Sequence, residues 1–289
     1  METFLQLTVS GIALGSIYGL VALGFLVVFH ATGLVNFATG QILMVGAVTT
    51  YLLLMDAALP YPIVVVGVIV IGLLLTIAFR FGIHLPMVRA GAPLYSMVVA
   101  TVAFGLVLTA LAGLIAGQAP RGVSPIVDAP AIRLGPVTIT WQQFIITVVA
   151  WLLVLAIWIF FSKTLTGISL RAVGINRNAA AVSGVRVSRM VTIGFAISLV
   201  ITVICGMLIS PIVGAGAAMG LSLAVKGFAA ATIGGMSSVY TGMIAGVALG
   251  LLEQYVGYYI STQWSPLVAY VALFLALVLM PARVRQAAH

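Results

Sequence analysis

SKTLTGISLRAVGINRNAAAVSGVRVSRM, residues Ser162 to Met190, is the only long polar interruption in a chain that is otherwise apolar. Its basic residues are Lys163, Arg171, Arg177, Arg186 and Arg189. Basic residues within about 15–20 positions of apolar spans are kept on the cytoplasmic side of a membrane. We therefore expect this segment, called the coupling segment below, to be cytoplasmic and to set the orientation of every other span.

A short helix is predicted inside this segment. Asn178 to Val182 (NAAAV) consists of good helix formers apart from Asn178, which suits an N-terminal cap. Gly184 can end the turn in the left-handed conformation. Two interpretations stay open from the residues alone: a docking helix for a soluble partner, or a solvated basic loop that only sets topology.

The composition defines the class of protein. Of 289 residues, 63% are hydrophobic and 6% are charged, which is too apolar for a soluble domain and typical of an all-α polytopic membrane protein. Continuous apolar runs such as Pro62 to Phe79 lack the alternation of barrel strands. The net charge of +8 is explained by basic residues at span ends, and the single Cys205 provides neither a disulfide framework nor a metal constellation. We expect one transmembrane domain over residues 1–289, interrupted by the polar segment at 162–190.

About nine transmembrane helices are predicted, at ~20 residues for each crossing. The apolar runs are Phe4 to Phe29, Ala38 to Met55, Pro62 to Phe79, Leu94 to Ala116, Trp141 to Phe161, Val191 to Val213, Ala217 to Gly234, Val239 to Ile260 and Trp264 to Met280. Ala217 to Gly234 is rich in glycine and contains Lys226, so the alternative is eight crossings and a re-entrant segment.

Charge supports an amino terminus outside and a carboxyl terminus in the cytoplasm. In this arrangement nine basic residues are cytoplasmic, namely Arg80, Arg89, Lys163, Arg171, Arg177, Arg186, Arg189, Arg283 and Arg285. Two, Arg121 and Arg133, are exterior.

Three separated motifs resemble one family. The run LRAVGINRNAAAVSGV from Leu170 is similar to the coupling loop of ABC importer permeases of the branched-chain amino acid (LivH and LivM) type. GIALGSIYGLVALGF and TGLVNFATGQILMVGA resemble the first two membrane segments of that family, and KGFAAATIGG followed by GMIAGVALGLLE resembles its carboxyl-terminal half. The motifs occur in the family's order over nearly the whole chain.

The resemblance implies an ABC importer permease fold in a bacterial inner membrane. It also implies a second permease subunit (a LivM-like homologue or another copy), two cytoplasmic ATPases and an extracytoplasmic solute-binding protein. The chain would then be no enzyme and would bind no cofactor, since it lacks a GxxxxGKS or GxxxxGKT loop; ATP and Mg²⁺ would bind to the partners. The solute would be a branched-chain amino acid, or urea, a short amide or an aromatic acid. Contact with the ATPases is implied for Arg171, Asn176, Arg177, Asn178, Ala179, Ala180 and Gly184.

Polar residues inside spans mark a candidate substrate pathway. Asn36, Thr39 and Gln41 interrupt an apolar stretch, which in lipid requires protein or a water-filled path around them. Capping of the following helix by Asn36 is an equal alternative. Lys226 and Glu253 are the intramembrane base and acid, which either pair or extend to the nearer interface.

Two glycine ladders are predicted to be helix contact faces, because four-residue spacing places small residues on one side of a helix. They are Gly11, Gly15 and Gly19, and Gly242, Gly246 and Gly250. A passive channel or a proton-coupled transporter remains the alternative function, whereas motifs of an intramembrane enzyme are missing from the sequence. The coupling segment separates these classes, because a channel has no use for a cytoplasmic helix that docks an ATPase.

Overall fold

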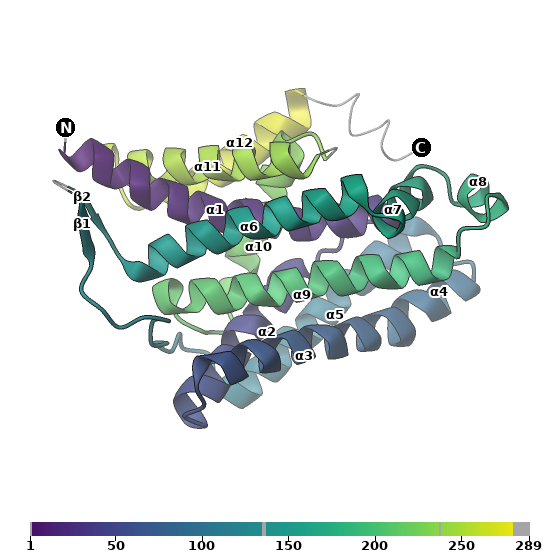
Figure 1. Ribbon diagram of the computed structural model, residues 1–289, viewed down its shortest axis with the longest axis horizontal. Coiled ribbons are helices and arrows are strands. Elements are labelled where there is room, and N and C mark those ends of the chain that lie inside the picture. Colours follow the sequence, from purple (N-terminus) through teal and green to yellow (C-terminus); the bar gives the residue numbers. More distant parts are fainter. Residues whose placement is uncertain (1, 135–136, 237, 280–289) are drawn as a thin grey trace. The chain divides into compact units, whose positions relative to one another are not determined.

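The computed structural model describes residues 2–134, 137–236 and 238–279, and most of them are helical (Figure 1). The long helices are α1 (Glu2–Thr32), α3 (Tyr61–Phe79), α5 (Leu94–Ala116), α6 (Trp141–Lys163), α9 (Val187–Val213) and α11 (Val239–Tyr259). The shorter ones are α2 (Thr39–Tyr51), η1 (Leu52–Asp56), η2 (Arg80–His84), α4 (Leu85–Arg89), α7 (Leu165–Ile175), α8 (Arg177–Val182), α10 (Met219–Ile233) and α12 (Ser265–Leu279). Two strands are β1 (Ile132–Leu134) and β2 (Val137–Ile139).

The chain divides into two compact units. Unit 1 comprises Met1–Leu23, Ser124–Leu155 and Val225–His289, and unit 2 comprises Gly24–Val123 and Ala156–Ala224. In unit 2, α2 packs against α3, α5 and α9. Unit 1 contains the strands, α11 and α12. The predicted coupling segment and the polar stretch around Asn36 both belong to unit 2.

Seven helical segments of the described chain are long and apolar enough to cross a membrane, and they agree with seven of the nine predicted spans. The other two predicted spans form α10 and α12, at 15 residues each. The number of crossings therefore stays a prediction. The predicted cytoplasmic residues Arg283 and Arg285 lie outside the described residues.

The third predicted span is longer than the sequence indicated. It was expected to end at Phe79, but the helix continues through the π-helical turn η2 and α4 to Arg89. Arg80 and His84 are both buried within this extension. A π-helical turn widens the helix locally and is frequent at functional sites.

A small antiparallel hairpin in unit 1 was not predicted. β1 pairs with β2 in the register Ile132 to Ile139. The Gln6 side chain then bonds to the backbone of Thr138 twice, donating from Nε2 to the carbonyl at 2.7 Å and accepting from the amide at 2.8 Å. The hairpin is thereby fastened to the first turns of α1.

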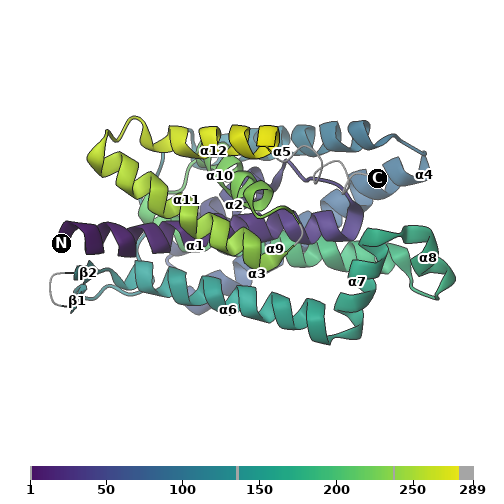
Figure 2. The same ribbon diagram turned by 90° about the horizontal axis from the view of Figure 1, so that it is seen from above.

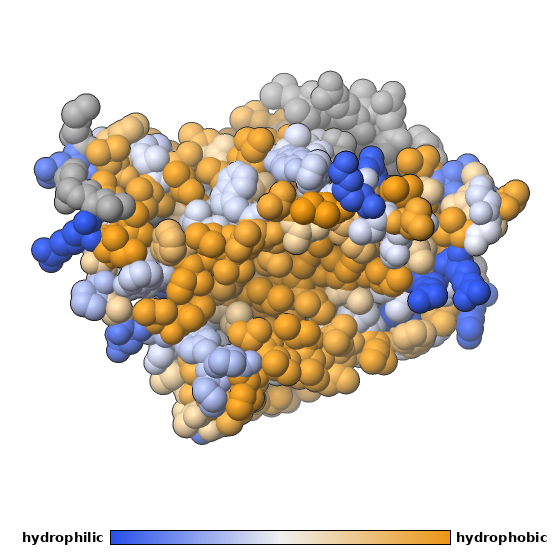
Figure 3. Space-filling view, in the orientation of Figure 1, coloured by the Kyte–Doolittle hydropathy of each residue, from blue (hydrophilic) through white to orange (hydrophobic). Residues whose placement is uncertain are grey.

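Exposed side chains of unit 2 match a helix bundle in lipid. Over α3 and α9 the face in Figure 3 is hydrophobic, and hydrophilic side chains gather at the end where α4 and α8 lie. On α3, Val66, Leu74 and Ile77 are each more than half exposed. Apolar surface of this kind is stable only against an apolar solvent.

The four-residue spacing predicted that each glycine ladder is a helix contact face, and in unit 1 the two ladders pack against each other. α1 and α11 lie side by side in Figure 2. A Cβ placed on Gly15 would lie 2.5 Å from Val247 Cα, and one on Gly11 would lie 2.9 Å from Leu251 Cα. Gly246 and Gly250 meet the backbone of Gly15 and Gly19 just as closely. Gly242, in the first turn of α11, lies against Gly234, where an added Cβ would be 2.7 Å from Gly242 N.

Candidate functional site

The coupling segment folds into two short helices, α7 and α8. Asn176 caps α8, because its backbone is extended (φ −152°, ψ 105°) and its Oδ1 accepts from Ala179 N at 3.0 Å. The prediction that Asn178 is the cap was wrong, since Asn178 lies inside the first turn. Gly184 ends the helix with φ +84°, as predicted.

Contacts within unit 2 hold α7 and α8 in place. The Arg177 guanidinium donates to the carbonyl oxygen of Thr32, the last residue of α1. Gly174 lies directly against the His30 backbone, where any side chain would collide with the carbonyl. Leu170 and Ala180 are buried beneath the two helices. The segment is therefore a positioned element of the fold and more than a solvated loop.

The outer surface of this segment combines charge with exposed apolar side chains. Ile175 is 87% exposed and Val182 is 91% exposed. Arg171, Asn178 and Ala179, predicted to contact a partner, are also exposed. Partial burial of the guanidinium lowers the pKa of Arg177 below its ordinary value.

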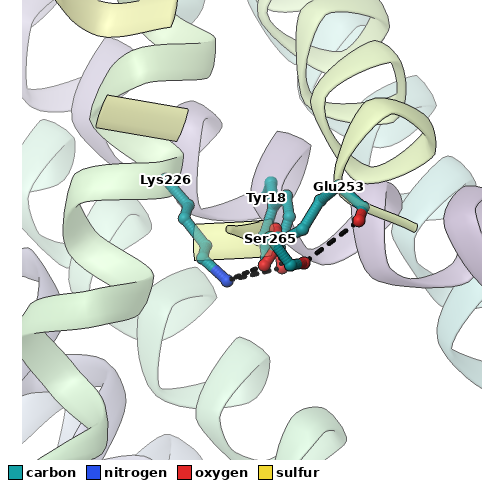
Figure 4. Close-up of polar contacts among 4 residues, drawn as sticks. All are labelled: Tyr18, Lys226, Glu253 and Ser265. Carbon is teal, nitrogen blue, oxygen red and sulfur yellow. Dashed lines mark hydrogen bonds and ion pairs between the residues drawn. The ribbon is translucent and has the colours of Figure 1, made fainter. Parts of the chain in front are cut away.

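Lys226 and Glu253 form an ion pair inside unit 1, which decides between the two alternatives left open above. Lys226 Nζ lies 2.5 Å from Glu253 Oε1, and their side chains are 12% and 10% exposed. Tyr18 lies between them (Figure 4): its hydroxyl donates to Glu253 Oε2 at 2.8 Å and accepts from Lys226 Nζ at 3.1 Å. Ser265 donates to the Glu253 backbone carbonyl at 3.0 Å. The charges are thus paired and hydrogen-bonded, as buried charges must be.

Asn36 lies in the non-helical connection between α1 and α2. Its Oδ1 accepts from Ala38 N at 3.1 Å, while the Thr39 hydroxyl donates to the Asn36 carbonyl at 2.6 Å. Asn36 therefore stabilises the turn before α2, whose N-cap residue is Ala38. Its Nδ2 is buried without a hydrogen-bond partner.

Gln41 lies on α2 against Gly105 of α5, and its Oε1 is also buried without a partner. The neighbouring Gly40 meets the backbone of Gly220 so closely that a Cβ would collide with it. The backbones of Gly40 and Gly220 thus approach each other closely. The predicted pathway residues fall into two groups, Asn36, Thr39 and Gln41 in unit 2 and Lys226 with Glu253 in unit 1. Their role in a substrate pathway stays a prediction.

The sequence also offers three hydroxyl side chains in or beside apolar spans, Thr101, Thr232 and Ser237, as weaker pathway candidates. The Thr232 hydroxyl donates to the Phe228 carbonyl at 2.8 Å, as lone hydroxyls in membrane helices do. Thr101 donates to the Val98 carbonyl at 2.7 Å and also accepts from Phe37 N at 3.1 Å. Ser237 lies outside the described residues.

Two buried polar features that the structure shows were missed in the sequence. Tyr18 was overlooked because a tyrosine in an apolar span gives no signal until its partners are known. Arg80 and His84 were treated as residues beyond a span, although their spacing of four places both on one helix face. That spacing could have indicated a polar cluster.

Comparison with known proteins identifies the family. Residues 7–277 match the model described as branched-chain amino acid transport system / permease component. The chain is 27% identical to the high-affinity branched-chain amino acid transport system permease protein LivH of Escherichia coli K12, covering 96% of this chain and 94% of that protein. It is 24% identical to BraD of Pseudomonas aeruginosa, a permease protein of the same description, with the same coverage.

The fold also resembles a solved structure, PsaBC from Streptococcus pneumoniae in complex with Fab. The TM-score is 0.55 at 16% identity, covering 98% of this chain and 94% of that one. The likeness supports the fold alone. Because the family model matches almost the whole chain, this protein belongs to the family of branched-chain amino acid transport permeases.

Proposed function

We propose that this chain is the transmembrane subunit of an ATP-driven importer that carries a branched-chain amino acid. Family membership supports the class of transporter, and the names of the LivH and BraD relatives support the solute. Two permease subunits, this chain with a second copy or a homologue, would form the pathway. An extracytoplasmic protein would deliver the solute.

The observation that carries the ATP-driven mechanism is the geometry of α8. Its six residues are capped at both ends and fastened to α1 through Arg177, yet Val182 is almost fully exposed. Covering exposed apolar side chains with a partner protein lowers the free energy of the complex, because apolar surface leaves water. A cytoplasmic ATPase is the partner that would use such a contact to move the spans.

Transmission through unit 2 follows from the same contacts. Movement of α8 acts on Thr32 through Arg177, and Thr32 is followed by the non-helical connection that contains Asn36. On the other side, α8 leads through four residues to Val187, where α9 begins. In this mechanism the partner subunits bind and hydrolyse ATP. This chain alternates the side of the membrane to which the solute pathway is open.

Reconstitution into proteoliposomes with both ATPases and the solute-binding protein tests the proposal. Ala180→Pro removes the bond from Ala180 N to the Asn176 carbonyl and should abolish ATP-driven uptake while insertion is normal. Ala181→Ser, an exposed change on the same helix that keeps the backbone bonds and lies outside the predicted ATPase contacts, is the control and should leave uptake intact. Uptake by this chain without the ATPases, driven by a pH gradient, would instead identify a secondary carrier. Unaltered ATP-driven uptake by Ala180→Pro would contradict the coupling role of α8.

A further inference from the structure

Helix α7 has two apolar sides, and the fold covers only one of them. Leu170 and Val173 are buried against the rest of unit 2. Leu165 is 84% exposed, Ile168 is 51% exposed and Ile175 is 87% exposed. Spacings of three and seven place these exposed residues on one side of the helix, away from the buried ones. They are called the outer stripe below.

The chain turns sharply between α6 and α7. Thr164 caps α7 with an extended backbone (φ −102°, ψ 144°), and its Oγ1 accepts from Gly167 N at 3.0 Å and donates to the Phe160 carbonyl at 2.6 Å. A Cβ on Gly167 would collide with the same carbonyl oxygen, so α7 begins directly against the last turn of α6. In both views α7 lies across the end of α6 and does not continue it (Figures 1 and 2).

Packing within unit 2 places α7 beside the membrane-spanning part of α9. Leu170 Cδ1 lies 3.7 Å from the position of a Cβ on Gly194, and Gly174 lies against the backbone of His30, inside the last turn of α1. Gly194 is five residues beyond the exposed Arg189, which is about 7.5 Å further along α9. Exposed arginines at the end of a span stay in the headgroup region or in water. Helix α7 therefore lies deeper than Arg189, where headgroups meet hydrocarbon.

The lipid-facing surface of α6 leads directly to the outer stripe. On α6, Leu152, Leu155 and Ile159 are 44–59% exposed, and Ile159 is one turn before Lys163, the exposed last residue of the helix. Only Thr164 separates Lys163 from Leu165. A lysine at the end of a span normally reaches the headgroups. The outer stripe thus begins at the headgroup level of α6.

The charge of the coupling segment suits a phospholipid surface. Residues 162–190 contain five basic side chains and no carboxylate. Basic residues near a bilayer are attracted to lipid phosphates and anionic headgroups. An apolar stripe together with basic residues is the pattern of helices that lie in the plane of the interface.

Helix α8 offers a contrast, because it lies where hydrophilic side chains gather (Figure 3). Its exposed apolar residue Val182 can be covered by a soluble protein from the water side. A soluble protein could cover Leu165 only by displacing headgroups beside the end of α6. The position of α7 therefore favours lipid over a soluble partner for the outer stripe.

We propose that α7 is an interfacial helix whose outer stripe lies in the phospholipid leaflet nearest α8, with Lys163 at the lipid phosphates. Asn176 joins the two helices rigidly, because its N–H donates to the Ala172 carbonyl of α7 at 3.0 Å and its Oδ1 accepts from Ala179 N of α8. An α7 held in the leaflet fixes the distance of α8 from the bilayer. Only the use of that fixed distance in energy coupling rests on the proposed function.

The test measures quenching of a fluorophore in full-length protein, in phospholipid nanodiscs without ATPases. Leu165→Cys and Ile168→Cys are each made on a Cys205→Ala background and labelled with an environment-sensitive dye. One quencher is phosphatidylcholine with a nitroxide near the start of its acyl chain, and the other is iodide in water. Both labels should be quenched more strongly by the nitroxide lipid than by iodide, with emission shifted to shorter wavelengths than in water.

Val182→Cys is the matched control, since Val182 is an exposed apolar residue on α8 and should show the opposite pattern. Leu74→Cys, on the exposed face of α3, should be quenched by the nitroxide lipid and verifies insertion. Stronger quenching by iodide at Leu165→Cys or Ile168→Cys, as at Val182→Cys, would overturn the proposal.

Addition of the ATPases separates this proposal from the proposed function. The label at Val182→Cys should become protected from iodide, while the labels on α7 should not change. Labels on α7 that are protected from iodide only when ATPases are present would assign the outer stripe to the ATPase and reject lipid. An unchanged label at Val182→Cys, with lipid quenching on α7, would contradict the proposed function and support the lipid contact.

Discussion

Arg177 donates to the carbonyl oxygen of Thr32, so α8 is bonded to the end of α1 although 145 positions separate the two residues. Gly33 follows with φ +70° and ends α1, and the connection to α2 begins there. The exposed helix α8 is thus bonded to the end of α1, directly before the non-helical connection that leads to α2.

The first prediction concerns the cap of α8. Asn176→Ala removes the side-chain oxygen that accepts from Ala179 N, which should destabilise the helix by ~1 kcal/mol. Hydrogen exchange at the Ala179 amide should become faster, and ATP-driven uptake should fall. Asn178→Ala is the control and should leave the exchange rate unchanged. The reverse pattern would restore Asn178 as the cap.

The second prediction concerns the buried ion pair. Glu253→Gln leaves the Lys226 charge without its partner and should destabilise the protein by ~3–5 kcal/mol, measured by thermal unfolding in detergent. The double variant Lys226→Met with Glu253→Leu should recover most of that loss, because no unpaired charge remains.

Transport by the double variant then distinguishes a structural role of the ion pair from a role in the substrate pathway. A folded double variant that imports normally shows that the pair is structural, and one that fails to import supports the predicted pathway role. Glu2→Gln, an exposed carboxylate on α1, is the control and should change neither stability nor uptake.

The third prediction concerns the glycine ladders. Gly15→Ala places a Cβ 2.5 Å from Val247 Cα, so α1 and α11 must separate, and stability should fall by ~1–3 kcal/mol. Gly82→Ala is the matched control, since Gly82 is helical and has no heavy atom within 4 Å of the added Cβ. There the higher helix propensity of alanine should leave stability equal or slightly higher. Equal effects of both substitutions would contradict close packing of the ladders.

The fourth prediction concerns orientation, which rests on the distribution of basic residues. Cysteines introduced at Ser124 and Ser183, both exposed, should react with an impermeant thiol reagent from opposite sides, Ser124 from outside. The native Cys205 is fully buried, and Cys205→Ala removes any background. Labelling of Ser183 in intact cells would reverse the proposed topology.

Local patterns predicted the fold well. The apolar run Leu94 to Ala116 coincides with α5, and the glycine spacing predicted contact faces on α1 and α11, though not which helix each would meet. Both signals depend on residues that are close in sequence. The cap of α8 was misplaced because two asparagines flank Arg177, and the choice between them depends on where α7 ends.

Features that depend on distant partners could not be predicted. Tyr18 bonds to Lys226 and Glu253, which lie 208 and 235 positions away. The extension of α3 was missed because Arg80 and His84 look like the polar end of a span, whereas their actual partners, Ser188, Thr192 and Phe195, come from α9. The hydrophobic periodicity of a single segment contains no information on contacts with a distant segment.

The arrangement around Lys226 also bears on how the protein is assembled during synthesis. Tyr18 enters the membrane early, whereas Lys226 is made 27 residues before Glu253. Until α11 emerges, Tyr18 can supply one hydrogen bond to the ammonium group but no negative charge. A lone lysine in hydrocarbon is unfavourable by ~2.5–3.5 kcal/mol on insertion scales. We therefore expect that, where α10 crosses the bilayer, its insertion depends on α11 and the two helices enter as a pair.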